Sequence, residues 1–344
     1  MSLQDELDRF VAEGLDKAAG HGEDYVELWR ALGRATAAGK RFRPALMMAA
    51  YHAYGGSDDE MAGRVAAGLE LLHTAFVIHD DVIDGDLVRR GAVNVSGTFS
   101  ERAVARAAGL QDCATFGLAA GVLAGDLALV GATREIALCG AAACTTRRLL
   151  DLLDDAVHVS AAGELADVAL SLGGSDHAGI LADVIRMEEC KTAVYSFQLP
   201  LQAGAVLAGA SDHTAGLLGE VGRLAGIGFQ LVDDLLGVFG DESVTGKSAL
   251  GDLREGKMTP LIAHARSTAA WPEISQHVGD RTIDEERAGA VRALLTDCGS
   301  RAYVEHLANR YMTESLRAAE DLHLDPTLMA ELTGLSQRVL GNAA

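Results

Sequence analysis

Three aspartates, Asp80, Asp81 and Asp84, lie within the segment HDDVIDGD (79–86), at the end of a long apolar run. At about 100° per residue, Asp80 and Asp84 share one helical face, and Asp81 precedes Asp84 by three residues. Such close carboxylates repel one another unless a cation neutralises them. Oxygen ligands without nearby thiolates favour Mg²⁺ over zinc. The segment therefore predicts a magnesium site, with a solvated acidic surface as the alternative.

A second acidic pair lies in FQLVDDLLGVFGD (229–241). Gln230, Asp233 and Asp234 share a helical face, while Gly237 stands where a third carboxylate would complete the cluster. Mg²⁺ usually binds one or two carboxylates together with substrate phosphates. Two acidic platforms, each at the polar end of an apolar helix, therefore predict a clamp for a phosphorylated ligand.

Basic residues recur beside these acids, although the chain is acidic overall. Arginine and lysine pair with phosphate through charge-assisted hydrogen bonds. Any one of these residues could be a solvated surface charge, but their repeated adjacency to the aspartates favours phosphate binding. They outnumber what one diphosphate requires, which indicates two phosphorylated substrates. The segments are GKRFRP (39–44), VRRG (88–91), Lys191-Thr192 and TGKSALGDLREGK (245–257).

Helical periodicity positions these residues. Apolar residues at i, i+3 and i+4 predict helices over Leu3–Ala19, Asp24–Ala38, Arg43–Tyr54, Asp58–Asp84, Ala114–Gly131, Ile180–Phe197, Thr214–Phe239 and Ala302–Leu322. Ser57 and Glu60 have the spacing of a capping box for the fourth of these. Alternating β-branched runs are scarce and no Pro- or Ser-rich linker interrupts the chain. We therefore predict an all-α fold with one large domain, 1–344, although 344 residues exceed the usual size of a single core.

Charge and composition exclude several functional classes. A net charge of −20 argues against a nucleic-acid partner, because phosphate backbones require a basic face. Five cysteines without metal-binding spacing suit reduced thiols in a cytoplasmic protein. The acidic N-terminus does not resemble a signal peptide. The longest apolar stretch, 117–132, carries Asp126 and is interpreted as a buried helix, so no transmembrane segment is expected.

Taken in order, these motifs resemble the trans-isoprenyl diphosphate synthases of the polyprenyl synthetase family over roughly Leu28–Leu322. The resemblance rests on GKRFRP, ELLHTAFVIHDDVIDGDLVRRG, GDLAL (125–129), AGELAD (162–167), KT (191–192) and FQLVDDLLGVFGD with two GK pairs after it. It implies a single helical bundle around a deep central cavity, usually dimeric. It also implies an enzyme that condenses isopentenyl diphosphate with an allylic diphosphate in head-to-tail 1'-4 elongation.

The resemblance assigns roles by position. Asp80, Asp81, Asp84, Asp233 and Asp234 match metal ligands for Mg²⁺, about three ions per active site. Arg89, Lys191, Gln230, Lys247 and Lys257 match residues that contact the allylic diphosphate. Thr192 and the Lys191 backbone lie where the allylic cation forms, so Lys191, Thr192 and Gln230 are the candidate catalytic residues. Lys40, Arg43, His73 and Arg90 match the isopentenyl diphosphate site, with Arg41 as an addition. Glu164 and Asp167 have a supporting role.

In the family that this chain resembles, residues beneath the first acidic motif decide where the growing tail meets a wall, so product length should depend on them. Phe76 lies four residues before Asp80, about one turn deeper, and the small Ala75 precedes it. A single aromatic residue there suggests a C15–C20 product, and geranylgeranyl diphosphate (C20) is our favoured hypothesis. Farnesyl and longer polyprenyl diphosphates remain alternatives, as does a purely structural role for Phe76.

Two other functions share parts of this pattern. In a class I terpene cyclase, Asp233, Gly237 and Asp241 would occupy the positions of the second metal motif. A cyclase uses one diphosphate, however, and needs neither GKRFRP nor His73 and Arg90. A non-catalytic partner subunit would typically lack the first acidic motif, which this chain keeps.

Gly237 departs from the family's DDxxD pattern at the third acid. If Asp233 is the principal ligand, that third acid is the least able to reach the metal directly. We therefore expect catalysis to be intact, with a weaker affinity for Mg²⁺. Asp241, on the face of Asp234, is expected to support the metal site indirectly.

Overall fold

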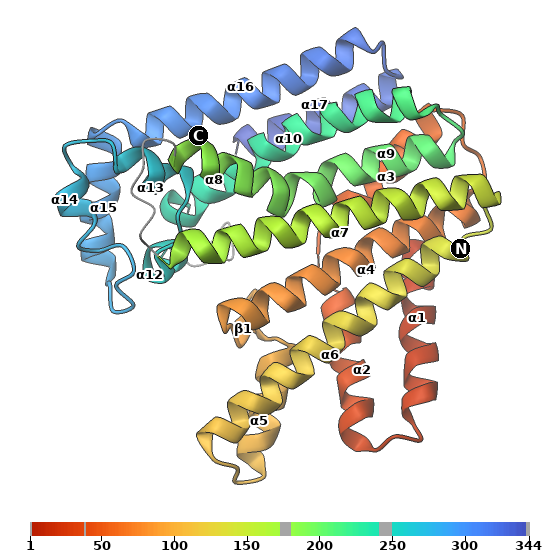
Figure 1. Ribbon diagram of the computed structural model, residues 1–344, viewed down its shortest axis with the longest axis horizontal. Helices are drawn as coiled ribbons and strands as arrows, with labels where there is room; N and C mark the ends of the chain where they lie inside the picture. The colour runs from red at the N-terminus through yellow and green to blue at the C-terminus, as the bar shows by residue number, and fades with distance from the viewer. Residues whose placement is uncertain (1, 38, 173–179, 241–249, 342–344) are drawn as a thin grey trace. The chain divides into compact units, whose positions relative to one another are not determined.

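The computed structural model describes residues 2–37, 39–172, 180–240 and 250–341. The predicted all-α class is confirmed, and a small antiparallel ribbon is the one addition among the described residues (Figure 1). The helices of the first half are α1 (Leu3–Ala18), α2 (Glu23–Ala37), α3 (Phe42–Ala53), α4 (Asp59–Asp84), α5 (Val95–Ala105), α6 (Leu110–Ala137) and α7 (Ala143–Ser171). The ribbon is β1 (Val88–Arg89) with β2 (Ala92–Val93).

The second half is also helical. Its elements are α8 (Ile180–Glu188), the π-helix η1 (Glu189–Gln198), α9 (Leu199–Leu207), α10 (Asp212–Phe239), α12 (Gly251–Glu255), α13 (Pro260–Ala265), α14 (Trp271–Ile274), α15 (Glu285–Asp297), α16 (Ser300–Asp321) and α17 (Pro326–Gly341). Contacts between residues divide the chain into two compact units, Met1–Leu153 with Ala203–Ala210, and Asp154–Gln202 with Ser211–Ala344. The single domain 1–344 therefore stays a prediction.

The first unit is built around α4, which packs along α6. Buried glycines of α6 lie against α4, because a Cβ at Gly121 would meet Val82 and one at Gly131 would meet Leu71, so the two helices approach closely. A Cβ at Gly125 would lie 2.9 Å from Cε1 of His79, so this glycine makes room for the imidazole next to the first acidic motif. Small residues of α6 thus allow close packing against α4 at this contact.

In the second unit, α10 packs against η1 and α16. Gly222 and Gly226 lie four residues apart on one face of α10. A Cβ at Gly222 would lie 2.7 Å from the Phe197 carbonyl oxygen, and one at Gly226 would lie 2.6 Å from Cα of Ala193. This stripe of small residues lets the second acidic motif sit on a helix that touches η1 directly.

The start of α4 differs from the prediction. The N-cap is Asp58, whose carboxylate accepts a hydrogen bond of 3.0 Å from the Met61 N–H, so the capping box expected at Ser57 and Glu60 is wrong. Asp58, one residue after Ser57, caps the helix instead. Its carboxylate accepts from an N–H that has no partner within the helix, and its negative charge interacts favourably with the positive end of the helix dipole.

The apolar stretch of α6 is buried on one face only. By length and composition, α4 and α6 are apolar enough to cross a membrane, but 72% of the α4 segment is buried against 39% of the α6 segment. The exposed face of α6 carries Leu118, Leu123 and Val130, each at least half exposed. The interpretation of 117–132 as a buried helix therefore holds for the side that faces α4.

Candidate active site

The first acidic motif forms the C-terminal end of α4. Gly85 adopts a left-handed conformation that ends the helix, and the ribbon then returns the chain so that Arg89 reaches the acids. The Arg89 guanidinium donates to Asp81 Oδ1 at 2.5 Å and to Asp80 Oδ2 at 2.7 Å. Asp84 is exposed. The ribbon was not predicted, but it brings together Arg89, Asp80 and Asp81 as one ionic cluster.

Burial distinguishes the two paired aspartates. Asp81 is 4% exposed, and its burial raises the pKa of its carboxyl group to about 6 although Arg89 opposes the shift. The nearby Asp80 carboxylate adds to the rise. Since burial disfavours the charged form, a cation at this position would be well placed to hold Asp81 ionised.

The free energy of unfolding of the metal-free protein should depend on Asp81 between about pH 4 and pH 6. The folded pKa lies above the ordinary 3.8, so the proton stabilises the folded state below about pH 4. That stabilisation is lost as the pH rises to about 6. Asp81→Asn, which has no such proton to lose, should gain about 2–3 kcal/mol relative to the wild type across this interval. Urea unfolding with a chelator at several pH values measures the difference.

Asp24→Asn is the control for that experiment. Hydrogen bonds from Arg106 and Arg102 lower the pKa of Asp24 to about 2. Its stabilising contribution is therefore present above about pH 4 and is lost only at lower pH. The difference between Asp24→Asn and the wild type should stay flat from pH 4 to 7, and a flat profile for Asp81→Asn would contradict the prediction.

Several basic residues converge on His73 within the first unit. Burial and the nearby charges of Arg43, Arg90, Arg89 and Arg41 lower the pKa of His73 well below its ordinary value, so the imidazole is neutral. Arg43 is 8% exposed and stacks on the Phe42 ring at 4.4 Å. Such a concentration of positive charge is well suited to an anion.

The backbone of this basic cluster is unusual. Arg41 and Arg90 have positive φ angles of 55° and 53°, a conformation that costs energy for residues other than glycine. Arg41 donates to Glu70 Oε1 at 2.6 Å and to the Thr36 carbonyl oxygen. These bonds fix the segment 39–43, from which Lys40 projects as an exposed residue. Strained backbone held in this way is typical of ligand-binding segments.

Phe76 and Ala75 lie one turn before the acids and differ in exposure. Ala75 is fully buried, whereas Phe76 is only partly buried. Most neighbouring apolar residues of α4, such as Leu71, Leu72 and Ile78, are buried in the core. Of the two candidates for product length, Phe76 is thus the one that presents side-chain surface.

The second unit places Lys191 and Thr192 on the π-helix η1, not on the regular helix predicted over Ile180–Phe197. Lys191 Nζ donates to Asp167 Oδ2 at 2.6 Å and to Glu164 Oε1 at 3.1 Å. Gly163 of α7 lies against the η1 backbone, since a Cβ there would fall 2.7 Å from the Cys190 carbonyl carbon and nearer still to the Lys191 nitrogen. π-helical turns often mark functional sites.

The second acidic motif lies in the last turns of α10. Gln230 Nε2 donates to Asp234 Oδ1 at 2.8 Å, while Asp233 is partly exposed. Asp234 is 7% exposed and Glu188 of α8 is 4% exposed. Burial raises the pKa of Glu188 well above its ordinary value, and the adjoining Asp234 carboxylate raises it further. Two buried carboxyl groups that face each other cannot both ionise cheaply.

Lys257 and Asp252 also lie near the second acidic motif. Lys257 pairs with Glu255 at 3.1 Å, and its charge opposes the rise in the pKa of Asp252, which burial and Asp234 bring to about 7. Asp252 lies over Gly237, because a Cβ there would be 2.9 Å from the Asp252 Cγ and nearer to its Oδ2. The predicted Lys247 and Asp241 lie outside the described residues.

The donors present fit a hard divalent cation. Asp234 Oδ2 and Glu188 Oε2 are buried oxygens that have no hydrogen-bond partner among the described residues. Neither can donate when both groups are ionised, so a shared proton or a cation must satisfy them. No three His, Cys, Asp or Glu side chains of the described segments already form a complete metal cage. Mg²⁺ suits such a half-built site, because substrate phosphates and water supply its other ligands.

Sequence reasoning missed Glu188, Asp252 and the packing role of Gly163. Glu188 lies three residues before Lys191, and its spacing alone would have placed it on the same helical face. Asp252 stands inside the quoted segment 245–257, yet only the fold places it over Gly237. Gly163 lies within AGELAD, where its small size was the available signal.

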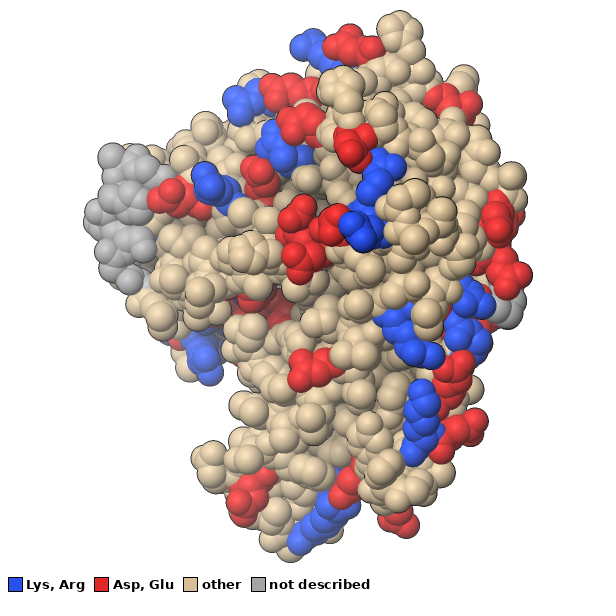
Figure 2. Space-filling model, turned by 45° about the vertical axis from the view of Figure 1, so that its right-hand side comes forward, with Lys and Arg blue, Asp and Glu red and all other residues tan. Residues whose placement is uncertain are grey.

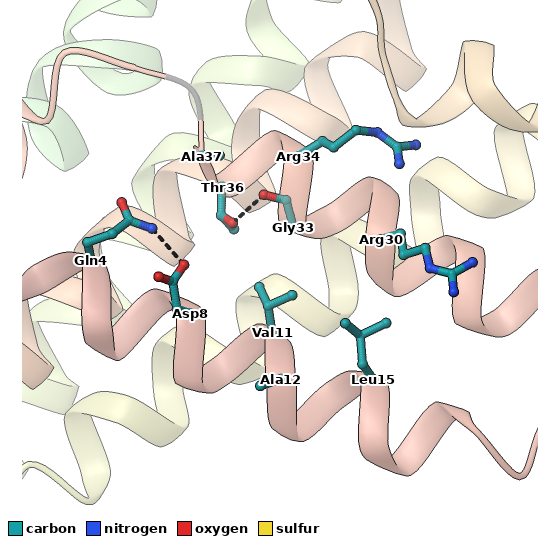
Figure 3. Close-up of a pocket in the computed structure, with 10 residues that line it drawn as sticks. All are labelled: Gln4, Asp8, Val11, Ala12, Leu15, Arg30, Gly33, Arg34, Thr36 and Ala37. Atoms are coloured by element: carbon teal, nitrogen blue, oxygen red, sulfur yellow. Dashed lines mark hydrogen bonds between the residues drawn. The ribbon is translucent and has the colours of Figure 1, made fainter.

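A separate groove lies between α1 and α2, with a volume of about 490 Å³. Figure 3 shows Val11 and Leu15 of α1 opposite Arg30 and Arg34 of α2, with Gln4 bonded to Asp8. It contains none of the candidate residues and follows from two helices that pack through Gly33. On the face drawn in Figure 2, acidic and basic side chains are intermixed.

Comparison with known proteins reveals similarity over most of the chain. The model of the polyprenyl synthetase family matches residues 27–295. Geranylgeranyl diphosphate synthase of Methanosarcina mazei is 34% identical over 280 residues, covering 81% of this chain and 78% of that protein. Geranylfarnesyl diphosphate synthase of Aeropyrum pernix is 32% identical over 296 residues, covering 86% of each.

The fold has close counterparts among solved structures. Geranylgeranyl pyrophosphate synthase from Corynebacterium glutamicum, complexed with isoprenyl diphosphate and magnesium, superposes with a TM-score of 0.90. The two chains are 30% identical, and the match covers 99% of this chain and 97% of the other.

Proposed function

Because this chain belongs to the polyprenyl synthetase family, and is thus an isoprenyl diphosphate synthase, we propose that it makes geranylgeranyl diphosphate. As a trans-prenyltransferase it elongates an allylic diphosphate. The partner substrate in our proposal is isopentenyl diphosphate, joined head to tail through a 1'-4 bond. The observation that carries the proposal is a pair of acidic helix ends, on α4 and α10, each accompanied by basic side chains within its own unit.

We assign Asp80, Asp81, Asp84, Asp233 and Asp234 to magnesium, with about three ions in the loaded enzyme. When bound, the metal neutralises charge on the diphosphate leaving group. The fit is supported by the unpartnered buried oxygen of Asp234. Magnesium and isoprenyl diphosphate are also the ligands of the similar Corynebacterium glutamicum enzyme.

The basic residues then bind and orient the two substrates. Arg89, Lys191, Gln230, Lys247 and Lys257 would hold the allylic diphosphate, whose C–O bond ionises as negative charge develops on the leaving group. The Lys191 backbone and the Thr192 hydroxyl would face the resulting allylic cation. Lys40, Arg43, His73 and Arg90, aided by Arg41, would hold isopentenyl diphosphate. Its double bond attacks the cation to form the new C–C bond, and the proton that is then lost passes to the released diphosphate.

Neutral His73 suits this second role. An imidazole without charge can donate one hydrogen bond to a phosphate oxygen and accept one from a neighbouring group. The surrounding guanidinium groups supply the positive charge. A site that combines charge with a fixed neutral donor distinguishes the orientation of the diphosphate as well as its presence.

Product length is the finer part of the proposal. Phe76→Ala should shift the products toward chains longer than C20, because removal of the ring one turn before Asp80 deepens the space open to the growing tail. The partial exposure of Phe76 supports this role. Chromatography of dephosphorylated products measures the shift. Phe99→Leu, at a ring buried against Phe116, is the control and should leave product length unchanged.

An unchanged product profile in Phe76→Ala would show that this ring is only part of the core. Two relatives are named for the products at issue: geranylgeranyl diphosphate (C20) and the longer geranylfarnesyl diphosphate (C25). Farnesyl diphosphate as the sole product would also contradict the C20 assignment.

One assay separates the proposed function from its rivals. The protein is incubated with isopentenyl diphosphate, an allylic diphosphate and Mg²⁺, and the products are separated. We expect a longer prenyl diphosphate. A hydrocarbon formed without consumption of isopentenyl diphosphate would indicate a terpene cyclase, and absence of turnover would indicate a partner subunit.

We further propose a cytoplasmic homodimer. Its five cysteines are free thiols, which suits a reducing compartment. The exposed apolar face of α6, which includes Leu118, Leu123 and Val130, supports association of two copies. Sedimentation equilibrium would contradict the dimer if it gave the monomer mass of 35.9 kDa.

A further inference from the structure

The space above Gly237 is filled by another carboxylate. Gly237 lies one turn after Asp233 on the same face of α10, where a side chain would project beside the acidic pair. A Cβ built there would lie 2.9 Å from the Asp252 Cγ and 3.5 Å from its Oδ1, with Oδ2 nearer than either. The carboxylate of Asp252 thus occupies the volume that a side chain at position 237 would need.

Asp252 is held in this place by its own segment. It belongs to α12, whose Leu253 is 1% exposed and anchors the turn in the core. The Gly279 N–H donates to the Leu253 carbonyl oxygen at 2.7 Å, and Arg254 Nη2 donates to the Ile283 carbonyl oxygen at 3.0 Å. The approach of Asp252 to Gly237 is therefore set by backbone and core contacts, which leave its carboxyl group little freedom to move away.

A second observation indicates that this acidic group faces a ligand. Asp234, beside Gly237 in α10, is 7% exposed, and its Oδ2 has no hydrogen-bond donor when Glu188, the buried carboxyl group next to it, is ionised. Its other oxygen accepts from Gln230. A buried oxygen without a donor is costly, and a cation is the ligand that satisfies several carboxylates at once.

We propose that Asp252 of α12 supplies the third carboxylate of the second acidic motif, and that Gly237 is the complementary residue that admits it. The inference rests on the proposed function, because the cation is the magnesium that accompanies the diphosphate. It changes the expectation drawn from DDxxD, in which Gly237 is a missing ligand and weakens the metal site. Position 237 is instead small because the acid comes from a different helix.

Two single variants and one exchange test the proposal. Asp252→Asn retains the shape of the side chain but removes its charge, and Asp252→Gly removes the whole group. The double variant Gly237→Asp with Asp252→Gly returns a carboxylate to position 237 and empties the space it needs. Asp297→Asn, at the exposed end of α15, is the matched control. Circular dichroism and urea unfolding establish that each variant folds.

The readout is binding, not turnover. Calorimetry measures the affinity for Mg²⁺ in the presence of saturating inorganic diphosphate. We expect Asp252→Asn and Asp252→Gly to bind Mg²⁺ about 10–100-fold more weakly than the wild type, as for other groups that support a metal site. The exchange variant should recover affinity to within about threefold, and Asp297→Asn should match the wild type.

Each other result is decisive. Wild-type affinity in both Asp252 variants would overturn the proposal while leaving the proposed function intact. Failure of the exchange variant to recover affinity, although it folds, would show that the carboxylate at 252 is not equivalent to one at 237. A wild-type protein that binds no Mg²⁺ with diphosphate would instead overturn the proposed function, and this inference with it.

Discussion

Asp80→Asn is expected to reduce the rate of prenyl transfer at least about 100-fold at saturating Mg²⁺, equivalent to about 3 kcal/mol of transition-state stabilisation. The substitution keeps the size of the side chain but removes a charged oxygen from the proposed metal site. Arg89 retains Asp81 as a partner, so the ribbon should stay in place. The loss should fall mainly on kcat, because the charge that develops on the leaving diphosphate is greatest in the transition state.

A variant in the same helix controls for effects on folding. Asp59→Asn alters an exposed carboxylate in the first turn of α4, where the side chain is 71% exposed, and should leave the rate within about twofold. The free energy of unfolding of Asp80→Asn should stay within about 1 kcal/mol of the wild type, since the lost ion pair with Arg89 and the relief of repulsion between the acids oppose each other. A rate within tenfold of the wild type would refute the assignment of Asp80 as a metal ligand.

Gly163→Ala should destabilise the protein by about 1–3 kcal/mol and also lower its activity. The new methyl group would meet the backbone of η1 at Cys190 and Lys191, and backbone atoms cannot move aside as a flexible side chain can. Separation of α7 from η1 would shift Lys191 away from Glu164 and Asp167, which now hold its ammonium group. Urea unfolding measures the stability, and steady-state kinetics with the allylic diphosphate measures KM.

Gly216→Ala provides a matched comparison. Gly216 also lies within a helix, α10, but a Cβ there would have no neighbour within 4 Å. Alanine should therefore stabilise the protein by about 0.5–1 kcal/mol through helix propensity alone. If both glycine variants had the same effect on unfolding, the contact of α7 with η1 would not be the cause.

Much of the helical framework could be predicted from the sequence because its helices bury one apolar stripe. The helix expected over Thr214–Phe239 is α10, which begins two residues earlier at the cap formed by Ser211. The helix α7 was not predicted, since its small and charged residues give little periodic contrast. The π-helix was also missed, because the pattern of apolar residues does not distinguish a wider turn from a regular one.

The candidate site shows the same division. The acids and bases that stand in short local motifs, such as Asp80 and Arg89, could be proposed as site residues from the sequence. Glu188 and Asp252 could not, because each becomes a candidate only through its contact with a residue on another helix: Glu188 with Asp234, and Asp252 with Gly237. Residues whose role depends on tertiary contact leave no periodic signal in the chain.

The ribbon that carries Arg89 has a consequence for the order of events at the first acidic motif. The guanidinium bonds to oxygens of Asp80 and Asp81, the two carboxylates that we propose as metal ligands, so it would act as their counter-ion before the metal binds. If Arg89 binds diphosphate as proposed, an arriving diphosphate would offer it another anion and thereby release the two carboxylates. Metal and diphosphate should then strengthen each other's binding by the same factor, which titration of each in the presence of the other would measure. The enzyme without substrate would thus bind the metal ion weakly when it is alone and more tightly when diphosphate is also present.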